Sequence, residues 1–300
     1  MTQPSRGHLL TEQINPQSTS LDQLSSLEIV DLFNQEDLKT IDAVKASREV
    51  IAQAIDITSE SLRGGGRLFY IGAGTSGRLG VLDAVECPPT FCTPPDLVQG
   101  ILAGGEGAMF KSSEALEDRS EDGAQAMIDH GITFQDVVVG ITAGGTTPYV
   151  RGALEKARKI GAKTVFISCV PSEQVKIDVD VDIRLLTGAE ILAGSTRLKA
   201  GTVTKMVLNI ISTGVMVKLG KVYGNRMIDV SVTNSKLLDR ALRIITDLTN
   251  LDRQTAQELL QQSGLSVKLA LLMHWKNLNL TQAQTLLTEN DGNLHQSSQL

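Results

Sequence analysis

Residues 67–77, RLFYIGAGTSG, decide the fold of this 300-residue chain. The apolar run Arg67–Ile71 has the length of a buried strand, and the glycine-rich segment Gly72–Gly77 follows it directly. Before it, Gly64–Gly66 ends a helical pattern that extends over 41–62. This order of helix, short apolar strand, glycine-rich turn and second helix is typical of a parallel sheet with helices on both faces.

The same cycle repeats toward the C-terminus. Helices are expected over 111–128 and 148–160, and further strands are expected at 97–103, 136–141, 163–168 and 183–186. The alternation predicts an α/β fold, a doubly wound and mainly parallel sheet. We assign this sheet domain to residues 58–221, preceded by an N-terminal helical arm over 1–57 and followed by a C-terminal helical region over 222–300.

The C-terminal region is expected to be a small three-helix unit, because the sheet signals stop after Gly220. Met206–Leu219 is apolar nearly all round, which is typical of a helix buried in the core or at a subunit interface. Asp252, Ser266 and Thr281 are candidate N-caps for the three helices, expected over 252–262, 266–277 and 281–289.

Composition and charge exclude several classes of function. The chain has 28 basic and 34 acidic side chains, a net charge of −6, and no basic cluster, so we expect no nucleic-acid partner. The longest apolar stretch, 206–217, is interrupted by polar residues and too short to span a bilayer, so no membrane partner is expected. The N-terminus lacks the pattern of a secretory signal, which predicts a cytoplasmic protein. The 3 cysteines and 4 histidines lie in no metal-ligand spacing, and we predict neither metal nor cofactor.

Two loops could hold a phosphate group. Gly74, Thr75, Ser76 and Gly77 follow the first strand and combine flexible glycines, two hydroxyls and the free N–H groups of a helix N-terminus. The loop also matches GxGxxG, but the acidic residue that a dinucleotide site needs after the next strand is missing, which disfavours NAD.

The second loop, 142–148, repeats the theme with the hydroxyls of Thr146 and Thr147. Two such loops suggest a sugar phosphate as the ligand. The alternative that both loops are ordinary tight turns of the fold explains their glycines but leaves the paired hydroxyls unexplained. Farther along, Ser195 and Lys199 are candidate ligand contacts at the start of the apolar helix, with local capping and a solvated lysine as the alternatives.

The sequence pattern indicates a catalytic role for one glutamate, Glu86, more strongly than for another, Glu117. Glu86 stands before Pro88-Pro89, so we expect it to close a helix, where the helix dipole would raise its pKa and suit it to hold a proton as a general acid. Glu117 lies in the helix expected over 111–128 among other acidic residues, and pattern alone does not separate it from solvated surface charges.

Several segments together resemble one enzyme family. They are GAGTSGRLGVLDAVECPP at 72–89, LAGGEGA at 102–108, DVVVGITAGGTTPYV at 136–150 and GAEILAGSTRLKAGTVTKMVLN at 188–209. In order and spacing they are similar to the N-acetylmuramic acid 6-phosphate etherases, along nearly the whole chain. The resemblance implies a sugar isomerase (SIS) domain, a homodimer without metal or nucleotide, and cleavage of the lactyl ether to N-acetylglucosamine 6-phosphate and D-lactate.

The resemblance also implies roles for the two glutamates. Glu86 matches the proton donor of the family, and Glu117 matches the second active-site residue, implied to be the base. The second loop differs from the family pattern, which commonly has serine and arginine at the positions of Gly144 and Thr146. Two alternatives use related chemistry: an aldose–ketose isomerase on the same fold, and a sugar-phosphate-sensing protein similar to the glucokinase regulatory protein. A glutamine-using transamidase is excluded because no cysteine follows Met1.

Overall fold

The computed structural model describes residues 6–111 and 116–299. The chain divides into two compact units. The first takes its residues from 1–85 and 96–212, and the second from 86–95 and 213–300. The three-part division predicted from the sequence remains a prediction.

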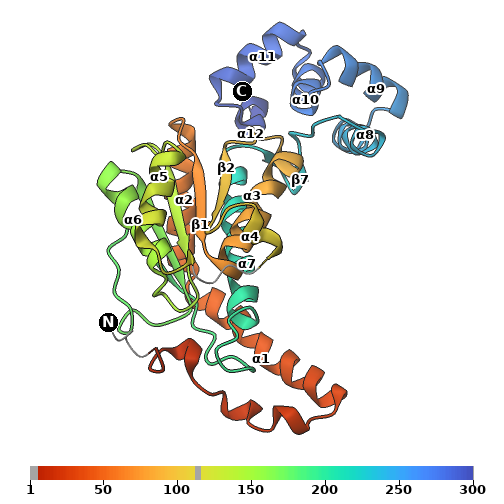
Figure 1. Cartoon of the computed structure of the whole chain (residues 1–300). Helices are drawn as coiled ribbons and strands as arrows, with labels where there is room; N and C mark the ends of the chain where they lie inside the picture. The colour runs from red at the N-terminus through yellow and green to blue at the C-terminus, as the bar shows by residue number, and fades with distance from the viewer. Residues whose placement is uncertain (1–5, 112–115, 300) are drawn as a thin grey trace. The chain divides into compact units, whose positions relative to one another are not determined.

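A parallel sheet forms the centre of the first unit (Figure 1). Its 5 strands are arranged in the order β2-β1-β3-β4-β5. Their bounds are β1 Leu68–Gly72, β2 Val98–Leu102, β3 Val137–Ile141, β4 Lys163–Ser168 and β5 Val181–Arg184. All four pairings are parallel, which confirms the predicted doubly wound α/β sheet. β5 lies two residues nearer the N-terminus than the strand expected at 183–186.

Helices cover both faces of this sheet because its strands are buried on both sides. On one face, Phe69 and Ile71 of β1 belong to the core formed with α5 (Ser120–Asp129) and α6 (Pro148–Ile160). On the other face, the hydroxyl of Tyr70 donates to Asp83 of α3 (Gly74–Phe91) over 2.9 Å. Asn209 of α7 (Lys199–Lys218) donates to the same carboxylate over 2.7 Å. The short helix α4 (Gly107–Phe110) follows β2.

The N-terminal arm consists of short 3₁₀ turns and a long helix. The turns are η1 Leu10–Glu12, η2 Pro16–Ser18 and η3 Leu21–Gln23, and the helices that follow are α1 Ser26–Ala46 and α2 Arg48–Arg63. A capping box between Ser25 and Glu28 starts α1. The hydroxyl of Ser25 accepts the backbone N–H of Glu28, and the carboxylate of Glu28 accepts the backbone N–H of Ser25.

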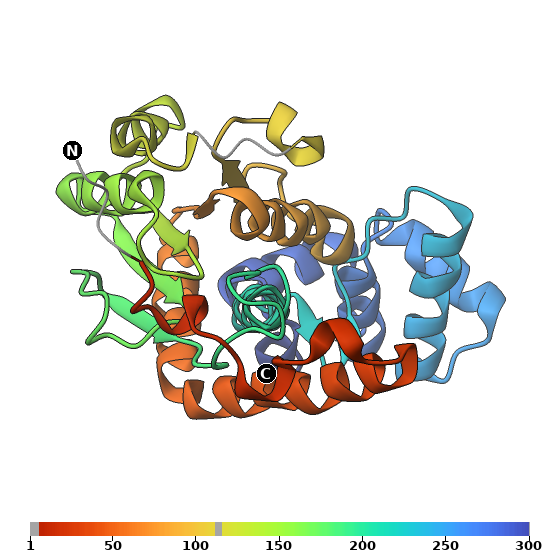
Figure 2. The ribbon, with the colours of Figure 1, turned by 60° about the horizontal axis from the view of Figure 1, so that its bottom comes forward.

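A buried ion pair fastens this arm to the start of α7. Lys199 is fully buried, and its Nζ lies 2.5 Å from Glu36 Oε2 of α1 and 2.7 Å from the carbonyl oxygen of Ala189. Asn15 donates to both Glu36 and Ala189. Figure 2 shows the N-terminal segment passing the N-terminal end of α7. Burial alone would raise the pKa of Glu36, but hydrogen bonds from Lys199, Lys39 and Asn15 outweigh it and lower the pKa to about 2.

α7 is longer than the sequence pattern indicated. It begins at Lys199 rather than Met206, and its length and composition would suffice to cross a membrane. The same properties occur in core helices of water-soluble proteins, and 56% of the most apolar 18-residue stretch of α7 is buried within the protein.

α3 also runs past its predicted end. The expectation that Glu86 closes this helix is wrong, because the helix continues through Pro88 and Pro89 to Phe91. Proline fixes a φ angle close to the helical value, so the helix can include both residues, although each lacks the N–H donor of a helical hydrogen bond and its ring crowds the preceding turn.

The second unit contains more elements than predicted. Its described residues form 5 helices from α8 to α12, with bounds Ser235–Thr249, Arg253–Gln262, Val267–Lys276, Leu280–Glu289 and Leu294–Gln299. A two-stranded antiparallel sheet, β6 Val222–Tyr223 and β7 Arg226–Met227, precedes them. The three expected helices are present as α9, α10 and α11, whereas α8, α12 and the two short strands were not predicted. Strands of two residues show no periodicity in the sequence.

The predicted helix caps of this unit are partly correct. Asp252 and Ser266 accept N–H groups at the starts of α9 and α10, which confirms both as N-caps. Thr281 is not a cap. Asn279 caps α11 instead, through a capping box with Gln282.

We predict that Lys199→Met lowers the free energy of unfolding by about 3–5 kcal/mol, because the buried carboxylate of Glu36 loses its buried cation and keeps only the half-exposed Lys39 as a charged partner. Replacing both partners, Glu36→Met with Lys199→Met, is expected to recover most of this loss. Urea unfolding measures both values. Arg48→Met, which breaks an exposed pair at 3.4 Å, serves as the control and should change stability little. A Lys199→Met protein as stable as the wild type would contradict the structural role of the pair.

The stability supplied by Glu36 should also depend on pH. Its pKa in the folded protein, about 2, lies below the ordinary value of 4.5, so the contribution is complete above pH 4.5 and is lost as the pH falls toward 2. We expect the difference in unfolding free energy between wild type and Glu36→Gln to be constant above pH 4.5 and to shrink below it. A difference that does not change with acidification would disprove this assignment.

Candidate functional site

A cavity of about 210 Å³ lies where the loops after β1 and β3 meet. β1 is flanked by β2 and β3, so the chain leaves β1 toward one side of the sheet and leaves β3 toward the other. This reversal of strand order is the place where open α/β sheets bind ligands, outside the carboxyl ends of the strands. The first loop consists of Ala73 and the first turn of α3, Gly74–Ser76, and the second loop is Thr142–Thr147.

Hydroxyl groups dominate the lining of the cavity. They belong to Thr75, Ser76, Thr142, Thr146, Thr147 and Thr196. The hydroxyls of Thr142 and Thr147 lie 2.7 Å apart, so one donates to the other. The loop after β1 leads directly into the first turn of α3, whose N–H groups have no carbonyl partner within the helix. This arrangement can hold a phosphate group.

The predicted phosphate-binding residues divide into two groups. Gly74, Thr75, Ser76, Thr146 and Thr147 line the cavity. Gly77, Ser195 and Lys199 are not among the described residues that line it.

Gly77 serves the packing of the first loop. A Cβ atom there would lie 2.5 Å from the carbonyl oxygen of Gly72, so glycine lets α3 start close against β1.

The start of α7 is organised by a residue that sequence reasoning missed. Both carboxylate oxygens of Glu190 accept backbone N–H groups, from Lys199 over 3.0 Å and from Ala200 over 2.9 Å. Burial raises the pKa of Glu190, although the N–H groups of Ala200 and Lys199 act against this. Glu190 therefore takes the capping role that was the alternative for Ser195. Its distance along the chain from the helix left no capping signal in the sequence.

The N-terminal arm contributes Arg6, Leu9 and Glu12 to the cavity. Leu9 is 1% exposed and packs against Val170 and Val175. Gln174 fixes the backbone on both sides of Leu9, accepting from Leu10 N over 3.0 Å and donating to His8 O over 3.0 Å.

Glu117 lies in the cavity wall and comes from a turn. The predicted helix over 111–128 is wrong at this position, because α5 begins only at Ser120; residues 112–115 of that prediction lie outside the described residues. The backbone explains the difference: the carbonyl oxygen of Glu117 accepts the N–H of Tyr149 at the start of α6, over 3.0 Å. This bond ties the turn to α6 and sets the carboxylate beside the second loop.

Glu86 is exposed on α3 and belongs to the second compact unit. It is not among the described residues that line the cavity. Within one chain, the cavity thus contains one of the two predicted glutamates.

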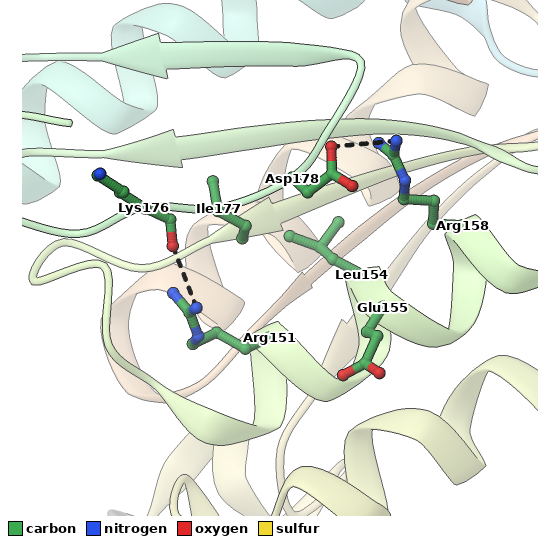
Figure 3. Close-up of a pocket in the computed structure, with 7 residues that line it drawn as sticks. All are labelled: Arg151, Leu154, Glu155, Arg158, Lys176, Ile177 and Asp178. Carbon is green, nitrogen blue, oxygen red and sulfur yellow. Dashed lines mark hydrogen bonds and ion pairs between the residues drawn. The ribbon is translucent and has the colours of Figure 1, made fainter.

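A larger groove of about 430 Å³ lies elsewhere, between α6 and the segment 176–178 (Figure 3). Its charges are largely balanced by one another. Arg158 pairs with Asp178 at 3.0 Å, and Arg151 donates to the carbonyl oxygen of Lys176 over 3.1 Å. The carboxylate of Glu155 pairs with Lys159 at 2.7 Å. None of the predicted site residues lines this groove.

Within residues 6–111 and 116–299, no group of three or more His, Cys, Asp or Glu side chains could hold a metal ion. The functional groups of the cavity's described residues are the carboxylates of Glu12 and Glu117, the guanidinium of Arg6, hydroxyls and backbone N–H groups.

Two family models match parts of the chain. The model of the glucokinase regulatory protein N-terminal SIS domain matches residues 49–158, and that of the C-terminal lid domain of the same protein matches residues 224–267. The chain is similar, with a TM-score of 0.49 and 19% identity over 66% of this chain and 99% of the other, to a phosphoheptose isomerase from Francisella tularensis.

Full-length relatives are much more similar. An N-acetylmuramic acid 6-phosphate etherase from Picosynechococcus sp. is 71% identical over 97% of this chain and 96% of its own length. An etherase of the same name from Synechocystis sp. is 70% identical, with the same two coverages of 97% and 96%. At this identity over nearly the full length, the chain belongs to the N-acetylmuramic acid 6-phosphate etherase family.

Proposed function

We propose that this chain is a carbon–oxygen lyase that cleaves the D-lactyl ether of N-acetylmuramic acid 6-phosphate. The products are N-acetylglucosamine 6-phosphate and D-lactate, formed by syn or anti elimination followed by hydration, in the catabolism of amino sugars. The observation that carries the proposal is the cavity at the switch point, the place between β1 and β3 where the strand order reverses. There the carboxylate of Glu117 lies beside two hydroxyl-bearing loops, and the chain belongs to the etherase family.

Binding precedes the chemistry. The phosphate fits the hydroxyls of Thr75, Ser76, Thr146 and Thr147 and the N–H groups that begin α3, because hydroxyls and N–H groups donate to its oxygens and the helix dipole favours its charge. With the phosphate held there, the open-chain sugar extends toward the wall that contains Glu117.

The first half of the reaction is an elimination. In the ring-opened sugar, the aldehyde at carbon 1 acidifies the proton on carbon 2, and the carboxylate of Glu117 removes it. The electron pair left on carbon 2 expels the ether oxygen from carbon 3, and the carboxylic acid of Glu86 protonates that oxygen. D-lactate leaves, and an unsaturated aldehyde remains.

The second half is the addition of water. Water attacks carbon 3 while one carboxylate takes its proton, and carbon 2 receives a proton from the other. The two glutamates thus work in reversed roles, and one water is consumed for each ether cleaved. The aldehyde accepts the electron pair during the elimination, so the scheme needs neither cofactor nor metal.

A homodimer would supply the second carboxylate. Glu86 is exposed on α3, and its neighbours Leu82 and Val85 expose 49% and 57% of their surface although both are apolar. Apolar side chains beside an exposed functional group are typical of a subunit interface. We propose that Glu86 of a second copy completes each cavity, that the dimer is cytoplasmic, and that residues 58–221 are its sugar-phosphate-binding domain.

We predict that the purified protein releases one D-lactate for each N-acetylglucosamine 6-phosphate formed from N-acetylmuramic acid 6-phosphate. Glu117→Gln and Glu86→Gln should each lower kcat by roughly 10²–10⁴-fold, the usual contribution of a general acid or base. Glu49→Gln, at an exposed position of α2, is the control and should retain full activity. Isomerised sugar without lactate would instead identify an aldose–ketose isomerase.

The two inactive variants test the shared site when they are unfolded, mixed in equal amounts and refolded. If each site combines Glu117 of one copy with Glu86 of the other, half of the dimers are mixed, and each of these has one intact site. We expect about a quarter of the wild-type activity to return. A mixture that stays inactive, while wild type treated in the same way regains activity, would show that both glutamates act from the same chain.

A further inference from the structure

The cavity has fewer positive charges than the substrate of the proposed function has negative ones. Among its described lining residues, Arg6 is the one positively charged side chain, and Glu12 and Glu117 are negatively charged. The proposed substrate has two anionic groups, the phosphate on carbon 6 and the carboxylate of the lactyl ether on carbon 3. Arg6 is thus the cation that this chain offers to these two groups.

The position of Arg6 favours the carboxylate. The hydroxyls and helix N-terminus at the two loops already form a phosphate site. Arg6 Nη2 lies 3.5 Å from Oδ1 of Asp118, the residue that follows Glu117. Because Glu117 must reach the proton on carbon 2, the neighbouring carbon 3 and its lactyl group lie at the same end of the cavity as Arg6.

Arg6 is held at this position by its surroundings. The N–H of Leu9 donates to the carbonyl oxygen of Arg6 over 2.9 Å, which closes a turn between them. Leu9 is buried, and Gln174 bonds to the backbone on both sides of it. The arm therefore presents the guanidinium to the cavity from an anchored turn.

The guanidinium also has donors to spare. The contact with Asp118 involves one of its two Nη atoms, and the side chain of Arg6 is 46% exposed. Arginine has five N–H donors in a planar fork, which matches the two oxygens of a carboxylate. A ligand carboxylate can thus bind Arg6 without first displacing a buried pair.

We propose that Arg6 binds the lactyl carboxylate of the substrate and makes the site selective for the lactyl ether over its product. This inference rests on the proposed function. N-acetylglucosamine 6-phosphate has no carboxylate and makes no contact with Arg6, so the arm favours the substrate and lets the sugar product leave.

Binding of substrate and product to a variant that cannot turn over the substrate tests the inference directly. In a Glu117→Gln background, calorimetry gives the Kd of N-acetylmuramic acid 6-phosphate and of N-acetylglucosamine 6-phosphate, with and without Arg6→Gln. We expect Arg6→Gln to weaken substrate binding roughly tenfold, because it removes a partly exposed, charge-assisted contact. Product binding should change less than about twofold. Arg6→Lys, which keeps the charge and loses the fork, should fall between.

Controls separate this inference from the proposed function. Arg48→Gln removes an arginine from an exposed pair at 3.4 Å and should leave both affinities unchanged. Equal weakening of both ligands would overturn the inference, because it would assign Arg6 to the phosphate or to the fold, and unchanged affinities would overturn it as well. Failure of the wild type to release D-lactate would reject the proposed function, whereas the ratio of the two affinities reports on Arg6 without turnover.

Discussion

The arrangement of the first unit depends on the buried pair of Lys199 and Glu36. Because a charge is costly to bury alone, the ammonium group can remain at the start of α7 only while α1 supplies its carboxylate. Asn15 extends the pair to the arm, donating to Glu36 and to the carbonyl oxygen of Ala189. Next to it, Glu190 holds the first N–H groups of α7. One polar cluster thus fixes the arm, the helix start and the segment that brings Thr196 to the cavity.

The cavity is accordingly built from three sources that meet at the switch point of the sheet. Strand order determines where the two hydroxyl-bearing loops lie, because each loop leads directly from a buried strand into a helix. The anchored turn at Leu9 adds the charged residues of the arm. The turn before α5 adds Glu117, fixed through its carbonyl oxygen by Tyr149. In the proposed function, phosphate binding and proton transfer therefore use different walls of one cavity.

Sequence reasoning predicted the parts of this structure that local patterns determine. The apolar runs and the glycine-rich turns after Ile71 and Ile141 identified the sheet and both loops, because strand burial and turn conformation depend on neighbouring residues. Lys199 was interpreted as a candidate ligand contact, because its partner Glu36 is distant in the chain and no local pattern indicates a buried ion pair. Glu190 was missed, because it lies several residues before the helix that it caps. Glu117 followed only from the family resemblance, since its turn depends on a bond to Tyr149. Arg6 was missed because nothing in the sequence places the arm beside the loops.

The central claim is that the ether is cleaved by removal of the proton from carbon 2, followed by addition of water to carbon 3. Isotopes test it most directly, with the reaction run to completion in D₂O and, separately, in water enriched in ¹⁸O. The account predicts deuterium on carbon 2 and ¹⁸O in the 3-hydroxyl of N-acetylglucosamine 6-phosphate, with no ¹⁸O introduced into the lactate hydroxyl. Product that retains hydrogen on carbon 2, with ¹⁸O in the lactate hydroxyl, would mean direct hydrolysis and would contradict the account.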